Sequence, residues 1–215
     1  MSKTTDKTVL VFDFDGTLAD TFEHFVSIGN RMAEEHGFRR AGAEEIEMLR
    51  DMSAWEAIRY FGVPLLKVPF LLAQAERELQ RRIGDVQAAE GVRDVILRLR
   101  SCGQTMGILT SNSQRNVMAF LRRHDMEVFD FVKTLSRLWG KVRQLRHVMR
   151  HYRLASERLL YVCDEVRDIR AARKAGVRAA AVSWGFNSAS ALRQEQPDYL
   201  LSRPEELLSI CGRGQ

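Results

Sequence analysis

The stretch TVLVFDFDGTLAD, residues 8–20, determines the fold prediction. It begins with an almost unbroken run of β-forming and aliphatic side chains, and the run stops at two carboxylates, Asp13 and Asp15, followed by Gly16. A short apolar run bounded by a glycine turn is typical of a strand buried on both faces, as in a parallel sheet. We therefore predict a buried parallel strand near the start of the chain.

The two carboxylates at the end of this strand are candidates for a functional site. Charged groups at the edge of a buried strand persist only when they are paired, hydrogen-bonded or bound to a metal. Asp13 and Asp15 are two residues apart, so both side chains start on the same face and can address one ligand. The simpler alternative is an ordinary Asp-Gly turn at a strand end, which is common.

Composition limits the class of protein. The chain has 215 residues, 45% of them hydrophobic, which is enough for one substantial core and a small accessory domain. Its three scattered cysteines argue against a disulfide framework and favour a reducing compartment. No apolar stretch approaches the roughly 20 residues of a spanning helix, and residues 1–7 are polar rather than a signal peptide. We expect a cytoplasmic protein without a membrane partner.

The formal net charge of +5 favours anionic partners, from phosphate esters to nucleic acid. Basic residues are densest in residues 137–158, where Arg143, Arg146, His147 and Arg150 would share one face of an amphipathic helix. No nucleic-acid recognition motif and no interleaved aromatic residues accompany them. We therefore interpret this face as a solvated surface and expect no nucleic-acid partner.

The pattern of the chain changes near residue 86. Between the first strand and that point, apolar residues recur at helical spacing and no strand pattern interrupts them. Start and stop residues delimit the helices, among them a capping box at Ser53 and Glu56, closing glycines at Gly37 and Gly62, and Pro69 in a first turn. The predicted helices are residues 21–37, 43–50, 53–61 and 69–83.

From Gly91 onward, helices alternate with short apolar strands. The predicted strands are residues 105–110, 129–133, 158–163 and 177–182, with a short one at Tyr199. This alternation predicts an α/β fold with a doubly wound parallel sheet, a Rossmann-like three-layer core. We predict that residues 1–20 and 86–215 form this core and that residues 21–85 form an inserted all-helical cap.

Polar residues stand at two further strand ends, where doubly wound sheets bind their ligands. Thr110, Ser111 and Asn112 precede a helix, where hydroxyls and free amides can bind an anion or simply cap the helix. Asp164 follows another strand, and Asp168 lies one helical turn later on the same side. Asp164 could ligate a hard cation, although acids are also common at helix starts.

Four segments, in this order, resemble the motifs of the haloacid-dehalogenase-like superfamily, whose members are mostly magnesium-dependent phosphatases. They are Phe12-Asp-Phe-Asp-Gly-Thr-Leu18, the strand end Thr110-Ser111-Asn112, the lysine Lys141 that opens a helix after Trp139-Gly140, and Asp164-x-x-x-Asp168. Cys163 stands where the family usually has glycine. The helical insertion resembles the small cap of the phosphoglycolate-phosphatase-like branch.

The resemblance implies hydrolysis of a phosphomonoester through an aspartyl-phosphate intermediate. It makes Asp13 the nucleophile and Asp15 the general acid/base, with Mg²⁺ held by Asp13, the backbone carbonyl of Asp15, and Asp164. Asp168 would orient the site, and Lys141 would neutralise the nucleophile. The phosphate-binding residues that the resemblance implies are Gly16, Thr17, Thr110, Ser111, Asn112 and Lys141, with Ser111 preferred to Thr110 as the hydroxyl.

In such an enzyme, substrate choice lies in the cap. The candidate residues are Arg50 and Trp55, which begin and end the interhelical loop Arg50-Asp51-Met52-Ser53-Ala54-Trp55, and Arg50 could pair with a second anionic group of the substrate. The expected partner is a small phosphorylated metabolite. The sequence specifies neither which phosphomonoester is used nor an oligomeric state.

Three alternatives stand beside the phosphatase interpretation. A sugar-phosphate mutase of this family has a histidine where Phe25 aligns and an arginine where Ala54 aligns. A dehalogenase lacks the second aspartate of the first motif, which is present here as Asp15. A non-catalytic binding protein is expected to lose motif acids; all four are present, and only Cys163 favours that alternative.

Overall fold

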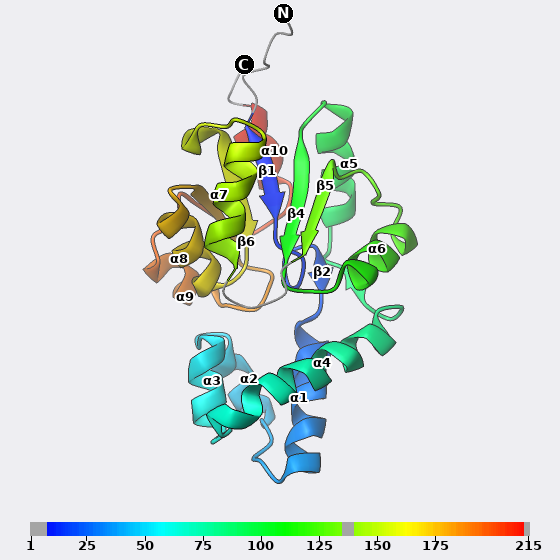
Figure 1. Ribbon diagram of the computed structural model, residues 1–215, viewed down its shortest axis with the longest axis vertical. Coiled ribbons are helices and arrows are strands. Elements are labelled where there is room, and N and C mark those ends of the chain that lie inside the picture. Colours follow the sequence, from blue (N-terminus) through cyan, green and yellow to red (C-terminus); the bar gives the residue numbers. More distant parts are fainter. Residues whose placement is uncertain (1–7, 135–139, 213–215) are drawn as a thin grey trace, which may run out of the picture.

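The computed structural model describes residues 8–134 and 140–212. Its centre is a parallel sheet of six strands in the order β5-β4-β1-β6-β7-β8, which confirms the predicted fold class (Figure 1). The strands are β1 Val9–Phe12, β4 Met106–Thr110, β5 Phe131–Thr134, β6 Leu159–Cys163, β7 Arg178–Val182 and β8 Tyr199–Leu201.

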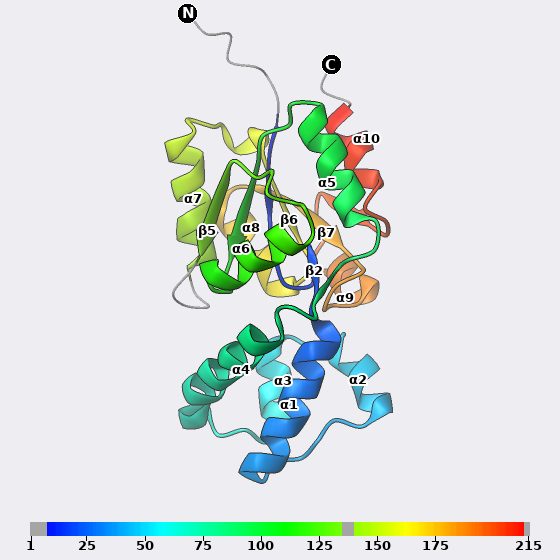
Figure 2. The same ribbon diagram turned by 90° about the vertical axis from the view of Figure 1, so that its right-hand side faces the viewer.

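Strand β1 lies in the middle of the sheet because both of its faces are apolar. Leu10 and Phe12 pack into one hydrophobic cluster, and Val9 and Val11 pack into the other. Helices α5, α6 and α10 cover the first face and α7, α8 and α9 the second (Figure 2). These helices are α5 Val92–Ser101, α6 Gln114–Arg123, α7 Lys141–His151, α8 Val166–Ala175, α9 Ala189–Gln194 and α10 Glu206–Gly212.

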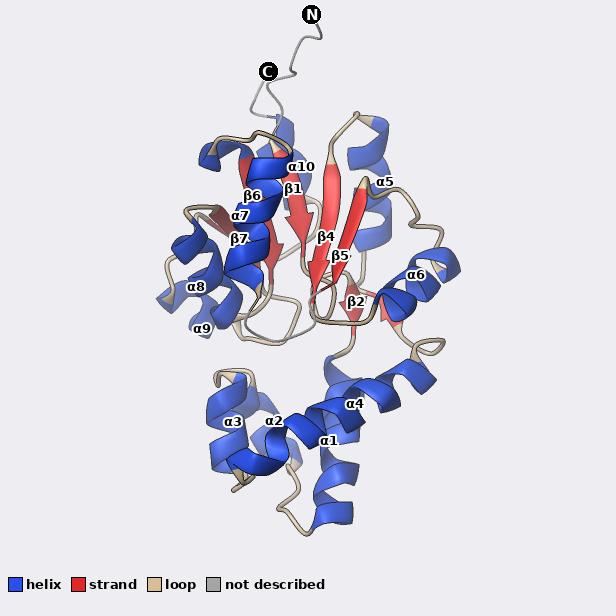
Figure 3. Ribbon diagram, viewed as in Figure 1, coloured by secondary structure: helices blue, strands red, loops and turns tan. Residues whose placement is uncertain are grey.

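Four further helices lie beyond the carboxyl ends of the strands (Figure 3). They are α1 Phe22–His36, α2 Ala43–Leu49, α3 Ala54–Tyr60 and α4 Val68–Arg82. The local signals acted as predicted: the Ser53 hydroxyl accepts a hydrogen bond from the Glu56 amide, and Gly37 ends α1 with a left-handed φ of 72°. We call α1 to α4 the helical insert.

A two-stranded antiparallel ribbon carries the chain into and out of the helical insert. Strand β2, Ala19–Asp20, pairs with β3, Gln87–Ala88. The sequence pattern did not reveal this pair, because two residues are too few to show a strand period. The division into a core and a cap at residues 20/21 and 85/86 stays a prediction, and the ribbon lies at these boundaries.

Helices α9 and α7 differ in how far the sequence predicts them. Helix α9 was not predicted; it is short and is capped by the Ser188 hydroxyl. On α7, Arg143, Arg146, His147 and Arg150 are exposed, as the amphipathic pattern indicated. Among the described helices, none has both the length and the hydropathy that crossing a membrane requires.

Candidate active site

Three neighbouring strands bring the polar segments to one edge of the sheet. Strand β1 lies between β4 and β6, so the residues that follow these strands meet where the sheet faces the helical insert (Figure 1). The ladder continues past β1, since the Asp13 amide donates to the Val162 carbonyl at 2.8 Å. The strand ends therefore position Asp13, Thr110 and Asp164 close to one another.

The centre of this edge is a buried ion cluster. The Lys141 ammonium donates to Asp13 Oδ2 and to Asp168 Oδ2, each at 2.5 Å, and all three residues are nearly inaccessible to solvent. Burial alone would lower the pKa of Lys141, but the two carboxylates raise it above its ordinary value. Burial raises the pKa of Asp13 despite Lys141, whereas Lys141 and Arg167 hold that of Asp168 below its ordinary value despite its burial.

Asp15 lies beside this cluster in a different environment. It is half-buried, and the Asn112 side-chain amide donates to both of its carboxylate oxygens at 3.1 Å. Asn116 in turn donates to Asn112 Oδ1 at 2.9 Å, which fixes the orientation of the Asn112 amide. Burial raises the pKa of Asp15 to about 6, and the bonds from Asn112 oppose that rise. Both protonation states of Asp15 are therefore accessible near neutral pH.

Asp164 is fully buried and is held by neutral donors. The Thr17 hydroxyl donates to Oδ1 at 2.7 Å, and the Phe186 amide donates to Oδ2 at 2.8 Å. Gly16 has a φ of 74°, and a Cβ there would stand 2.1 Å from Asp164 Oδ2, so only glycine fits against this carboxylate. Burial and the charge of Glu165 raise the pKa of Asp164 to about 7.

The donor set fits a hard divalent cation. Oxygen atoms of Asp13, Glu165 and Asp168 lie within 4.8 Å of one another. Burial raises the pKa values of Asp13, Asp15 and Asp164, because it disfavours their charged forms, and a bound cation would offset that cost. Oxygen ligands of this kind suit Mg²⁺. Of the ligands inferred from the sequence, Asp13 belongs to this close group, while the carboxylate of Asp164 is turned toward Thr17 and Phe186.

The residues assigned to phosphate binding lie around the same edge, with different partners. The Thr110 hydroxyl is fully buried and accepts from the Asn112 amide at 2.9 Å, while Ser111 is half-buried. Asn112 contacts Asp15, and Thr17 contacts Asp164. The Thr110 hydroxyl thus already has a partner, and the preference for Ser111 over Thr110 as the hydroxyl that faces a ligand stays a prediction.

Arg50 lies at the boundary between the helical insert and the core. Arg50 Nη1 donates to the Gly185 carbonyl at 2.6 Å, and its guanidinium group lies 3.7 Å from the centre of the Phe22 ring. In this arrangement Arg50 joins the helical insert to the loop after β7, in addition to any contact with a substrate. Trp55, in the first turn of α3, has 40% of its surface exposed.

The loop that follows β7 also belongs to this edge, although no residue of it was predicted as part of the site. Phe186 donates its amide to Asp164 and packs edge-on against Phe22 and Phe25 of α1. Asn187 donates to the Arg50 and Met52 carbonyls and accepts from the Val166 amide at the start of α8. The sequence does carry a signal for this loop. Trp184-Gly185-Phe186-Asn187 follows the end of a strand, which is where doubly wound sheets bind their ligands.

Cys163 replaces the glycine of the family pattern without a steric conflict. It is the last residue of β6, pairs with Ala181 of β7, and is fully buried in the cluster on the α8 face. Among the described residues, those with a left-handed φ and a side chain are Asp125, Arg153 and Gln196, so Cys163 is not in a conformation that requires glycine. The departure leaves the backbone of the site intact.

Comparisons with known proteins show the family and the fold. The family described as "Haloacid dehalogenase-like hydrolase" matches residues 10–182. A phosphoglycolate phosphatase of Synechococcus elongatus is 35% identical over 204 residues, covering 93% of this chain and 94% of that protein. A pyrophosphatase of Bacillus velezensis is 26% identical, covering 97% and 99% of the two chains. A solved haloacid dehalogenase-like protein of Streptococcus pneumoniae has the same fold, with a TM-score of 0.81, 21% identity, and 96% and 99% coverage.

Proposed function

Because this chain belongs to the haloacid dehalogenase-like hydrolase family, we propose that it is a magnesium-dependent phosphatase acting on a small phosphomonoester through an aspartyl-phosphate on Asp13. The observation that carries the proposal is the contact of the buried Asp13 carboxylate with Lys141 at 2.5 Å, beside a second carboxyl group, Asp15, whose pKa is about 6. A cytoplasmic location, which the sequence favoured, stays part of the proposal.

The two aspartates that follow β1, Asp13 and Asp15, have different roles in the proposed reaction. A carboxylate oxygen of Asp13 attacks phosphorus, and the bond from phosphorus to the ester oxygen breaks. Asp15, in its protonated form, gives its proton to the departing alcohol. Asp15 then accepts a proton from the water that attacks the aspartyl-phosphate, so the hydrolysis regenerates both carboxyl groups and releases inorganic phosphate.

The remaining groups balance charge and hold the phosphoryl group. Lys141 stabilises the ionised form of Asp13 and can contact a phosphoryl oxygen. Asp168 holds Lys141 in place, at 2.5 Å. Asp13, Asp164, the Asp15 carbonyl and Glu165 are the groups available to hold Mg²⁺, which when bound would neutralise phosphoryl oxygens and these carboxylates. Ser111 is the proposed hydroxyl that binds the phosphoryl group.

The relatives named above suggest the substrate class. Two of them are named as a phosphoglycolate phosphatase and a pyrophosphatase, enzymes whose substrates are small phosphorylated molecules. We propose the same class here, with selectivity that depends on the helical insert and includes Arg50 and Trp55.

The test is a hydrolysis screen over phosphomonoesters, with and without Mg²⁺, combined with trapping of the phosphoenzyme. Acid quenching during turnover of a ³²P-labelled ester is expected to leave label on the peptide that contains Asp13, and hydroxylamine is expected to remove it. The screen includes sugar phosphates, so that a mutase would be recognised by isomerised product. Full turnover in excess chelator, or label on another residue, would contradict the proposal.

A further inference from the structure

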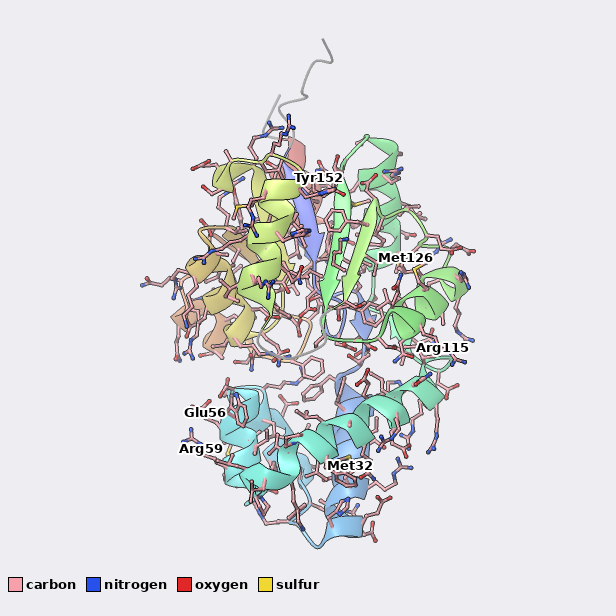
Figure 4. All side chains as sticks on the ribbon, in the orientation of Figure 1. Met32, Glu56, Arg59, Arg115, Met126 and Tyr152 are labelled. Carbon is pink, nitrogen blue, oxygen red and sulfur yellow. The ribbon has the colours of Figure 1, made fainter. Side chains whose placement is uncertain are left out.

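The helical insert contains an open apolar cavity that the proposed chemistry does not use. Its volume is about 310 Å³, within the lower range of small-molecule sites. One face of α1 contributes Phe25, Val26 and Gly29 to its wall, and apolar side chains of α2, α3 and the following loop close the other sides. Figure 4 shows this part of the molecule, with Met32, another residue of the wall, labelled.

The wall of this cavity is only half covered. Phe25, Leu49, Ile58 and Phe61 are apolar residues of the wall, and each is intermediate in exposure. At Gly29, an added Cβ would meet nothing within 4 Å, so the space beside α1 is open there. A contiguous apolar surface left in this state marks a site for a ligand or partner.

The cavity continues to the catalytic edge. Glu165, Phe186 and Asn187 of the core are part of its wall. A carboxylate oxygen of Glu165 lies within 4.8 Å of oxygens of Asp13 and Asp168, and the Phe186 amide donates to Asp164. A group attached to a phosphoryl group on Asp13 is therefore within reach of the cavity, so a small molecule bound across this boundary explains it better than a remote partner.

Two polar side chains of the wall, Arg39 and Asn30, already have partners. Arg39 contacts Glu45 and lies over the rings of Tyr60 and Phe61. Asn30 exchanges two hydrogen bonds with the backbone of Ala41. Neither group is placed to pair with a second anion in the cavity, so the cavity selects by apolar contact.

We propose that this cavity binds an apolar aliphatic or aromatic portion of the substrate alcohol, so that the enzyme prefers phosphomonoesters whose leaving group carries such a portion. This inference rests on the proposed function. It differs from a preference for an anionic leaving group, for which the chain offers another place: Arg77 and Arg81 of α4 and Arg115 of α6 line a separate cleft of about 540 Å³. Of these three, Arg115 is labelled in Figure 4.

The experiment uses n-alkyl phosphates from methyl to hexyl, whose leaving groups differ little in intrinsic reactivity. For the unmodified enzyme, kcat/KM is expected to rise about fourfold for each added CH₂ that enters the cavity, the equivalent of about 0.8 kcal/mol. Gly29→Leu fills the open space and is expected to lower kcat/KM for hexyl phosphate at least tenfold, while methyl phosphate changes less than twofold. Gly84→Leu is the matched control, because Gly84 also has open space but lies outside the cavity wall.

A second measurement separates this inference from the proposed function. Calorimetry with methylphosphonate and hexylphosphonate reports binding without turnover. Hydrolysis of methyl phosphate with no dependence on chain length would overturn the cavity inference and leave the phosphatase proposal intact. Absence of all hydrolysis, together with tighter binding of hexylphosphonate that Gly29→Leu abolishes, would overturn the phosphatase proposal and support the cavity. A dimer in sedimentation velocity that Gly29→Leu dissociates, or a preference for anionic esters that Arg115→Ala removes, would overturn the cavity inference.

Discussion

The central strands of the sheet are completely buried, whereas parts of the helical insert are exposed to solvent. Every residue of β1, β4 and β6 is buried, while α2 has no buried residue among its seven. The sheet can therefore hold the charged cluster of Asp13, Lys141 and Asp168 in one arrangement, since closely packed surroundings resist displacement. The helical insert, with its half-exposed apolar wall, can adapt to a ligand. Chemistry and selectivity are thus assigned to regions with different packing.

The largest expected effect is at the nucleophile. Asp13→Asn removes the attacking oxygen charge and should lower kcat at least about 10³-fold without unfolding the protein. The measurement is steady-state hydrolysis together with circular dichroism. Asp20→Asn is the control, because it makes the same chemical change at an exposed position of β2. Near-normal turnover of Asp13→Asn would break the assignment of chemistry to the sheet.

Asp15→Asn should lower kcat about 10²- to 10⁴-fold for an alkyl ester, because a neutral amide cannot transfer the proton. The loss should be much smaller for an aryl phosphate with an acidic leaving group, which departs without protonation. Comparing the two esters at one pH measures this difference. Equal losses on both would indicate that Asp15 acts by holding the site rather than by proton transfer.

The ion cluster of Asp13, Lys141 and Asp168 is expected to contribute to the stability of the core through charge pairing. Lys141→Met leaves Asp13 and Asp168 buried without their cation and should cost about 3–5 kcal/mol of unfolding free energy. Urea unfolding measures this loss. Lys133→Met, at an exposed position of β5, should change stability by less than about 0.5 kcal/mol. Similar small losses in both variants would show that Lys141 does not stabilise the buried carboxylates of Asp13 and Asp168.

A matched pair of leucines compares the packing of the two regions directly. Leu10→Ala, in the fully buried β1, should cost about 2–5 kcal/mol. Leu49→Ala, on the half-exposed cavity wall, should cost less than half as much, because water already reaches that wall. Urea unfolding of both variants gives the two values. Equal costs would mean that the helical insert is as tightly packed as the sheet.

The last expected effect is the pH dependence of the stability of the metal-free protein. The pKa values of Asp164 and Asp15, about 7 and about 6, lie above the ordinary carboxyl value of about 3.9. Between about pH 4 and 7 the folded state therefore binds more protons than the unfolded state, so these two groups make stability fall as pH rises. Asp168, whose pKa is lowered, acts oppositely and only below about pH 4.

Thermal unfolding in chelator from pH 5 to 8 measures this dependence. Tm should decline across the range, Asp164→Asn should flatten the decline, and Mg²⁺ should raise Tm more at pH 8 than at pH 5, because the ion replaces the protons. A Tm that rises with pH across this range would contradict the raised pKa values.

The sequence by itself determined the local architecture. The uninterrupted apolar run of β1 specified a buried parallel strand, and the capping residues Ser53 and Gly37 acted within a few residues of their own position. The order of Asp13, Lys141 and Asp164 along the chain identified the family, which the match over residues 10–182 shows. These signals act over a few residues or depend on residue type, so the sequence alone shows them.

The tertiary structure alone decided which partner each polar group has. Asn112 contacts Asp15, which lies 97 residues away in the sequence, and Thr17 contacts Asp164, which lies 147 residues away. Phe186 packs against Phe22 and so joins the edge of the sheet to α1. The cavity beside Gly29 likewise exists only when the four helices of the helical insert and the loop after β7 come together. Such contacts depend on how strands and helices pack in space, and no periodicity of the chain records where two distant loops meet.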